Sequence, residues 1–406
     1  MNRENPAEAV DARAARWLTC LMFFTFAMTT DAVGSVIPRL IEEHGLSMTA
    51  AGAFQYATMA GIATGALLLG FLADRIGRKL TIIMGLALYG LASLLVALSG
   101  QYTMLVALLT VSGLGISVFK TGALALIGDI TPSNTAHTRL MNNVEGFFAV
   151  GAIVGPAVVA VLLARGLSWK WLYLFAAAIC AGLVIMAARA RYPATRTAVQ
   201  RPDLRQMLRV MRDPAAVGFS LLVMLYVAAE VAIYVWMPTW LQSYAGSWGW
   251  LAASALTLFF VLRALGRFLG AWLLERASWT AVLALVGGLV FACFAGSLAG
   301  GVEAAAWLLP LSGLFMSVVY PTLNSKAISC FPHHQHGSIA GVVLFFTALA
   351  AALGPLAMGA ASDAAGSPRA GFVLATGFAF LLFAGLFYNW LANPARRRLQ
   401  AADLVA

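Results

Sequence analysis

Twelve long apolar runs constrain the fold of this chain more than any other feature of its sequence. They cover residues 17–38, 51–72, 80–99, 103–128, 140–164, 170–189, 215–241, 250–274, 278–298, 304–330, 338–361 and 371–392. A membrane-spanning helix needs about 20 apolar residues, and only helices and closed barrels satisfy their backbone polar groups inside a bilayer. The runs are too long and too uniformly apolar for barrel strands. We therefore predict an all-α membrane protein with twelve transmembrane helices.

Charge is scarce in this chain and unevenly placed. Only 10% of the residues are charged, against about a quarter in a soluble domain. Most of the 26 Lys and Arg fall on the side that also holds both termini, which the positive-inside rule assigns to the cytoplasm. The net charge of +10 is therefore an orientation signal in a lipid bilayer and does not indicate a nucleic-acid partner. Residues 1–16 are polar and show no cleavable signal peptide, so we expect a multi-pass inner-membrane protein with both termini in the cytoplasm.

One long polar connection separates six apolar runs from the other six. It is rich in Pro and Arg and occupies residues 190–214. The sequence therefore predicts an N-terminal six-helix bundle over residues 1–189, a cytoplasmic basic linker over 190–214 and a C-terminal six-helix bundle over 215–406.

The two halves share sequence at one constant offset. A Gly-Leu-x-x-Ser-Val segment begins at Gly113 in the fourth run and again at Gly313 in the tenth. Pro132 follows the fourth run as Pro332 follows the tenth. Matching elements in both halves indicate an internal repeat, so the two bundles are expected to be pseudo-symmetric.

The turn between the second and third runs reads Gly-Phe-Leu-Ala-Asp-Arg-Ile-Gly-Arg-Lys over residues 70–79. Gly77 permits a tight turn, and the basic residues hold that turn in the cytoplasm. The segment closely resembles the signature loop of the major facilitator superfamily of secondary transporters. That resemblance implies two six-helix halves with the substrate between them, and a cytoplasmic gate. The expected gate residues are Gly70, Asp74, Arg75, Gly77, Arg78 and Lys79. Arg267 is added because the end of the eighth run resembles an incomplete second copy of this loop.

Ionisable residues inside the runs are costly and by default mark a pathway, a relay or a binding site. Asp31 lies near mid-depth of the first run, where a partly desolvated carboxylate can take up a proton. Lys120 in the fourth run needs an acidic partner, so a permanent Asp31–Lys120 ion pair is the alternative for Asp31. Glu145 is shallower, and substrate contact and a structural role are equally expected for it. The proposed proton-coupling residues are Asp31, Lys120, Glu230 and Glu145.

Glu230 in the seventh run shares one helix face with two tyrosines, since Tyr226, Glu230 and Tyr234 recur every four residues. Arg263 in the eighth run is deep enough to neutralise Glu230 or to hold an anionic substrate. The expected substrate contacts are Gln55, Tyr56, Lys120, Asn143, Glu145, Tyr234, Trp236, Arg263, Tyr320 and Asn324.

Two branches of the superfamily share further patterns with this chain. Asp31, Glu230 and the Tyr-Pro-Thr segment that begins at Tyr320 resemble the fucose-permease branch of proton-linked sugar symporters. Lys120 departs from that branch, which carries an acidic group at about this place. Lys120 and the Gly-Asp pair ending at Asp129 are similar instead to the lysophospholipid-transporter branch, which implies an amphiphile with a charged headgroup.

These observations predict a transporter and not an enzyme. The leading expectation is proton-coupled movement of a small polar solute, a sugar or sugar-like molecule that can carry charge, by alternating access. The alternative is transport of amphiphiles, either drug efflux or lysophospholipid flipping. A receptor that moves nothing is disfavoured because the signature loop is intact. The four scattered cysteines show no metal spacing or disulfide framework, so no metal and no cofactor are expected, and we expect a monomer.

Overall fold

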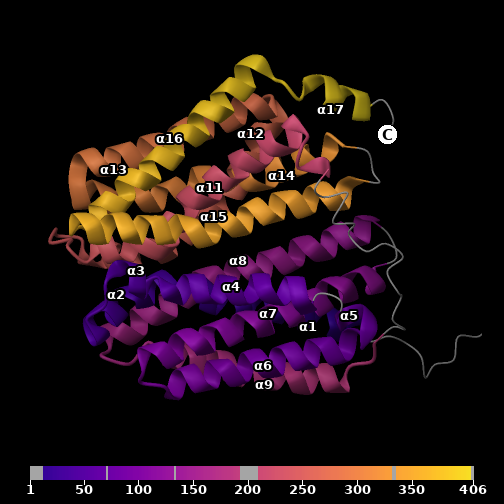
Figure 1. Cartoon of the computed structure of the whole chain (residues 1–406), viewed down its shortest axis with the longest axis vertical. Coiled ribbons are helices and arrows are strands. Elements are labelled where there is room, and N and C mark those ends of the chain that lie inside the picture. Colours follow the sequence, from indigo (N-terminus) through magenta and orange to yellow (C-terminus); the bar gives the residue numbers. More distant parts are fainter. Residues whose placement is uncertain (1–11, 70–71, 132–133, 193–208, 332–334, 404–406) are drawn as a thin grey trace, which may run out of the picture. The chain divides into compact units, whose positions relative to one another are not determined.

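The computed structural model describes residues 12–69, 72–131, 134–192, 209–331 and 335–403, and in these residues every regular element is a helix (Figure 1). Among the described residues, ten helical segments are long and apolar enough to cross a membrane. The twelve predicted runs exceed these ten segments by two, for two reasons. The segment Trp279–Ser329 has 51 residues and holds two runs. The main helix of the second run, Ala53–Leu69, has only 17 described residues and is too short to be counted. The all-α class is confirmed.

The chain divides into two compact units, which are described separately. Unit 1 comprises Met1–Val36 and Ala53–Val199, and unit 2 comprises Ile37–Gly52 and Gln200–Ala406. Residues 37–52 group with unit 2, although along the chain they lie between the two segments of unit 1. The predicted division at the 190–214 linker stays a prediction.

Unit 1 is built from helices that pack as α6 on α7 and α9, α4 on α7, and α1 on α8. Its elements are α1 (Ala12–Thr30), the start of α2 (Val33–His44), α4 (Ala53–Leu69), α5 (Leu72–Arg75), α6 (Arg78–Leu98), α7 (Tyr102–Ile130), α8 (Asn134–Ala164) and α9 (Trp171–Arg189). Tyr89 lies fully buried in the core of this unit. Its hydroxyl donates to the Thr25 carbonyl at 3.1 Å and lies 2.7 Å from the Thr29 hydroxyl, which joins α6 to α1.

Unit 2 packs α12 on α13, α11 on α15 and α16, and α13 on α16. Its elements are α3 (Met48–Ala51), α11 (Pro214–Leu241), α12 (Gly249–Arg276), α13 (Trp279–Met316), α14 (Val319–Ser329), α15 (His336–Ala365), α16 (Pro368–Ala392) and α17 (Arg396–Asp403). Two predicted runs meet inside α13 at Gly301, whose φ of 70° and ψ of −158° interrupt the helix.

Each unit contains a close helix contact at one of the two glycines that occupy equivalent places in the internal repeat. A Cβ at Gly113 would overlap the Thr58 carbonyl oxygen, and one at Gly313 would overlap the Phe259 carbonyl oxygen. The absent side chain therefore lets α7 approach α4 in unit 1 and α13 approach α12 in unit 2. Gly113 and Gly313, which match in the sequence repeat, therefore make the same kind of close helix contact, each within its own unit.

Two of the predicted continuous spans are broken next to candidate site residues. Asp31 and Ala32 form a turn between α1 and α2, and the Asp31 amide donates to the Ala27 carbonyl at 3.0 Å. Ser317 and Val318 separate α13 from α14 just before Tyr320. Interrupted helices place backbone polar groups and side chains at mid-depth, as in the binding sites of many transporters.

Candidate functional site

The strongest polar cluster of unit 2 is an ion pair deep inside two spans. Arg263 Nη2 on α12 lies 2.6 Å from Glu230 Oε1 on α11. The Tyr226 hydroxyl donates to the same oxygen at 2.9 Å. The side chain of Glu230 is 10% exposed and that of Arg263 23%. The predicted neutralisation of Glu230 by Arg263 is present in the structure.

Two tyrosines on the helix of Glu230 contact aromatic rings of neighbouring helices. The rings of Tyr226 and Tyr320 lie 6.2 Å apart, and those of Tyr234 and Phe260 lie 6.5 Å apart. Tyr234 and Tyr320 are half-buried, whereas Tyr226 is fully buried. The cluster therefore combines one cation, one carboxylate and several ring faces in a single unit.

Trp236 and Asn324, the other predicted contacts of unit 2, lie in different surroundings. The Trp236 ring is buried, and its indole N–H donates to the Pro355 carbonyl at 3.1 Å. Asn324 is half-buried on α14, one turn after Tyr320. Their roles in substrate contact stay predictions.

The charged residues of unit 1 are arranged differently. The Lys120 ammonium lies 5.6 Å from the ring centroid of Phe23 and 5.0 Å from that of Phe26. The carboxylates of Glu145 and Asp31 are the charges that act on it, Glu145 more strongly. Lys120 therefore lies against two aromatic rings, and the charges of Glu145 and Asp31 also act on it.

The predicted polar contacts of unit 1 differ in exposure. Gln55 on α4 is 1% exposed, and neither polar atom of its amide has a hydrogen-bond partner in the part of the chain that the structure describes. Tyr56 is half-buried, and Asn143 and Glu145 on α8 are exposed. Burying an amide whose polar atoms lack hydrogen-bond partners costs free energy. A ligand or water molecule that bonded to the Gln55 amide would remove this cost.

The predicted cytoplasmic gate contains a buried ion pair. Arg78 Nε donates to Asp129 Oδ2 at 2.9 Å, and the two side chains are 5% and 8% exposed. Gly77 has φ 89°, which confirms the tight turn predicted there. Arg75 and Arg267 are exposed. Gly70 lies outside the described residues, as does the side chain of Asp74.

Lys79 ties this gate segment to the end of α9. Its ammonium donates to the Ala190 carbonyl at 3.2 Å and lies 5.7 Å from the centroid of the Tyr192 ring. Burial raises the pKa of the Tyr192 hydroxyl to about 12, so the ring that the ammonium faces stays neutral at physiological pH.

Two acidic residues have structural partners that sequence reasoning did not assign. Asp129 is the partner of Arg78, although the sequence analysis placed it only in a family pattern. Asp363, near the end of α15, accepts hydrogen bonds from the backbone amides of Met48 at 2.7 Å and Thr49 at 2.8 Å. Asp363 thereby fastens α3 to α15 within unit 2. The position of Asp363 near the end of a span indicates that it needs a partner. The sequence does not identify that partner, because Thr49 lies 314 residues away along the chain.

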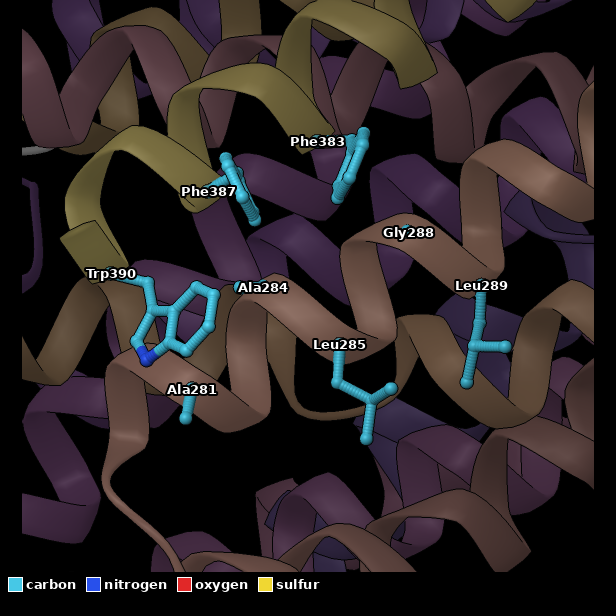
Figure 2. A pocket seen from close by; sticks show the side chains of 8 residues that line it. All are labelled: Ala281, Ala284, Leu285, Gly288, Leu289, Phe383, Phe387 and Trp390. Atoms are coloured by element: carbon cyan, nitrogen blue, oxygen red, sulfur yellow. The ribbon is translucent and has the colours of Figure 1, made fainter.

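A groove of about 450 Å³ lies between α13 and α16 and is lined mainly by apolar side chains. Figure 2 shows Leu285 and Leu289 on one helix and Phe383, Phe387 and Trp390 on the other. None of the predicted site residues lines it. Its side chains suit a hydrocarbon environment.

Comparison with known proteins agrees with this architecture. The family model described as Major Facilitator Superfamily matches residues 19–355. The L-fucose-proton symporter of Escherichia coli (strain K12) is 25% identical over 412 residues, which cover 93% of each chain. The 4-hydroxybenzoate transporter PcaK of Pseudomonas aeruginosa is 33% identical over 146 residues, but this match spans only 36% of the present chain and 32% of that relative.

A solved structure shares the fold over nearly the whole chain. It is a bacterial homologue of the human lysosomal transporter Spinster, with a TM-score of 0.75, 15% identity and coverage of 98% of this chain and 99% of the other. The family match covers most of the sequence. The chain belongs to the Major Facilitator Superfamily.

Proposed function

We propose that this chain is a proton-coupled secondary transporter that moves a small polar solute across the inner membrane by alternating access. The observation that carries the proposal is the Glu230–Arg263 ion pair with its Tyr226 hydrogen bond, enclosed in two spans of unit 2. A buried charge pair of this kind is expensive to maintain in a membrane helix and is expected at functional positions. The names of the relatives, a fucose-proton symporter and a 4-hydroxybenzoate transporter, support small solutes as cargo.

Asp31 is the first proposed protonation site, and Glu230 is the second. Asp31 occupies the turn that interrupts the first span, and the charge of Lys120 acts on it. A nearby cation favours the ionised carboxylate, so movement of Lys120 away from Asp31 would favour proton uptake. Gln55, Tyr56 and Asn143 in unit 1, and Tyr234, Tyr320 and Asn324 in unit 2, are the proposed solute contacts.

Uptake by the purified full-length chain in liposomes tests this proposal. Labelled L-fucose and 4-hydroxybenzoate are offered with and without an imposed pH gradient. We expect one of them to accumulate above its external concentration only while the gradient lasts. Accumulation that is indifferent to collapse of the gradient would remove proton coupling, and no movement of any small solute would remove the small-solute function.

Transport of amphiphiles is the second candidate. It is favoured by the position of the Lys120 ammonium against the rings of Phe23 and Phe26, because a cation beside ring faces suits a charged headgroup with an apolar body. In the same liposomes, movement of a fluorescent lysophospholipid between leaflets without uptake of either small solute would favour this candidate.

A further inference from the structure

We infer that the groove between α13 and α16 binds an acyl chain of an anionic phospholipid, and that arginines at one end of the groove bind the headgroup of this lipid. The inference goes beyond the proposed transport function, because the lipid is a bound component of the protein and not its cargo. It concerns residues of unit 2 alone and does not depend on which solute is moved.

The sequence of α13 creates the hollow. Ala281, Ala284 and Gly288 lie on one face of this helix, since they recur every three or four residues. Their small side chains leave space that the aromatic rings of α16 do not fill (Figure 2). The groove opens outward, because Leu285 on one wall is 55% exposed and Trp390 on the other is 44% exposed. An apolar hollow on the outer surface of a membrane protein suits a hydrocarbon chain.

The groove is about as long as one leaflet is deep. It extends along α13 from Ala281 to Leu289, which is about 12 Å at about 1.5 Å per residue. Half of the hydrocarbon core of a bilayer is about 15 Å. Just beyond Leu289, the Phe291 ring stacks on the Phe383 ring at 6.2 Å and contacts the Phe380 ring at 5.3 Å. These rings close the deep end of the groove, so an acyl chain enters from the other end.

That other end carries positive charge on both walls. α13 begins and α16 ends there, and Figure 2 shows Ala281 beside Trp390 at this end. Arg276 precedes α13 along the chain, whereas Arg396 and Arg397 follow α16, and all three side chains are exposed. Tryptophan at the end of a span is typical of the headgroup level of a membrane. An acyl chain in the groove therefore has its headgroup at the level of these arginines.

The short helix α17 holds two of these arginines in place. Arg398 Nη1 donates to both carboxylate oxygens of Asp213, at 2.8 and 2.9 Å, and its guanidinium lies 5.7 Å from the centroid of the Phe331 ring. These contacts fasten α17 to the start of α11 and the end of α14, and leave Arg396 and Arg397 exposed.

The charge of this end selects the headgroup. Guanidinium groups bind phosphate oxygens in a bidentate geometry. The positive-inside rule assigns this end to the cytoplasm, where the leaflet is rich in anionic lipids. An anionic headgroup complements the three arginines, whereas a zwitterionic headgroup brings a cation of its own.

Native mass spectrometry of the purified full-length chain tests the inference. The protein in detergent is given equal amounts of phosphatidylglycerol and phosphatidylcholine with identical acyl chains, and the bound lipid is counted. We expect phosphatidylglycerol to be bound at least about tenfold more than phosphatidylcholine, because each arginine near the surface adds to the attraction. Equal binding of the two lipids would overturn the inference.

One pair of double variants tests the headgroup site. Arg396→Gln/Arg397→Gln should lower the binding of phosphatidylglycerol to the level of phosphatidylcholine. Arg13→Gln/Arg16→Gln is the matched control, because it removes two exposed arginines at the start of α1 in unit 1. We expect the control to bind lipid as the wild type does. An equal loss in both double variants would show that the lipid follows net charge, and the proposed site would be wrong.

A second pair of variants tests the groove. Ala281→Phe places a ring in the open end and should lower the binding of phosphatidylglycerol at least about fivefold. Ala271→Phe makes the same change at an exposed position of α12 outside the groove and should have no effect. Thermal unfolding without added lipid shows that each variant is folded, and the arginine variants test the site without altering helix packing. Unchanged lipid binding in Ala281→Phe would overturn the inference. A lipid-free dimer that Ala281→Phe dissociates would also overturn it, since the groove would then bind a second copy of the chain.

Discussion

The two units place charge inside their spans in opposite ways. In unit 2, Glu230 and Arg263 meet directly at 2.6 Å and Tyr226 adds a hydrogen bond to the same oxygen. In unit 1, the Lys120 ammonium faces the rings of Phe23 and Phe26, and the charges of Glu145 and Asp31 also act on it. The desolvation cost of a charge is thus offset by a contact ion pair in one unit and by aromatic faces together with two carboxylate charges in the other.

This difference implies that the two units depend on their buried charges to different degrees. A contact pair is strongly destabilised by loss of one member, because the other charge is left buried. A cation on ring faces depends less on any single partner, since each cation–π contact contributes only about 0.5–2 kcal/mol. We therefore expect the stability of unit 2 to respond sharply to loss of either charge of its pair, and the stability of unit 1 to respond less to loss of the Lys120 charge.

The largest expected effect is on function. Asp31→Asn removes the proposed proton carrier of unit 1 and should abolish accumulation driven by a pH gradient. Exchange of labelled for unlabelled solute should survive in part, since the amide keeps the size and shape of the carboxylate. Both are measured in liposomes, with Glu43→Gln as the control because it is the same kind of carboxylate-to-amide change at an exposed position paired with Arg39. Unchanged accumulation in Asp31→Asn would remove the coupling role of Asp31.

The largest expected effect on stability is in unit 2. Glu230→Ala should lower the free energy of unfolding by about 3–5 kcal/mol, because Arg263 keeps its charge inside the span. Thermal unfolding in detergent would show this as a lower Tm, and Glu230→Ala combined with Arg263→Leu should recover much of the loss. A single variant as stable as the wild type would mean that the pair is not the main stabilising feature of the cluster.

Sequence alone could predict the fold and part of the site. Apolar runs of spanning length give the helices directly, and Gly77 gives the turn because only glycine adopts its positive φ without strain. The pairing of Glu230 with Arg263 was also predictable, since two opposite charges in consecutive spans each need a partner.

Other features depend on which helix faces meet, and the sequence does not contain that information locally. Asp129 lies 51 residues from Arg78 and could have been assigned to several cations. The break at Asp31 has no proline or glycine within the turn itself to predict it. Trp236 stands at the end of a tyrosine-lined face in sequence, yet its indole is buried against α15. Its proposed substrate contact therefore needs a test on the protein.

An intermediate effect is expected at Tyr226. Tyr226→Phe removes one hydrogen bond to an ionised carboxylate and leaves the ring contact with Tyr320. A hydrogen bond to a charged group contributes about 1.5–3 kcal/mol, so the loss of stability should be smaller than for Glu230→Ala. Tyr234→Phe is the matched control, because Tyr234 lies on the same helix face. Equal losses of stability in both variants would mean that the hydrogen bond from Tyr226 to Glu230 contributes no more than an ordinary tyrosine hydroxyl.

The smallest effect is expected at Lys120, and it tests the other half of the comparison. Lys120→Met removes the ammonium but keeps a flexible apolar chain that can contact the rings of Phe23 and Phe26. The lost cation–π attraction is of the order of 1–2 kcal/mol, and it is offset by relief of the desolvation cost of the charge. We expect the Tm in detergent to change far less than in Glu230→Ala. A fall as large as that of Glu230→Ala would show that Glu145 and Asp31 depend on Lys120 as closely as Arg263 depends on Glu230, and the two clusters would then follow the same principle.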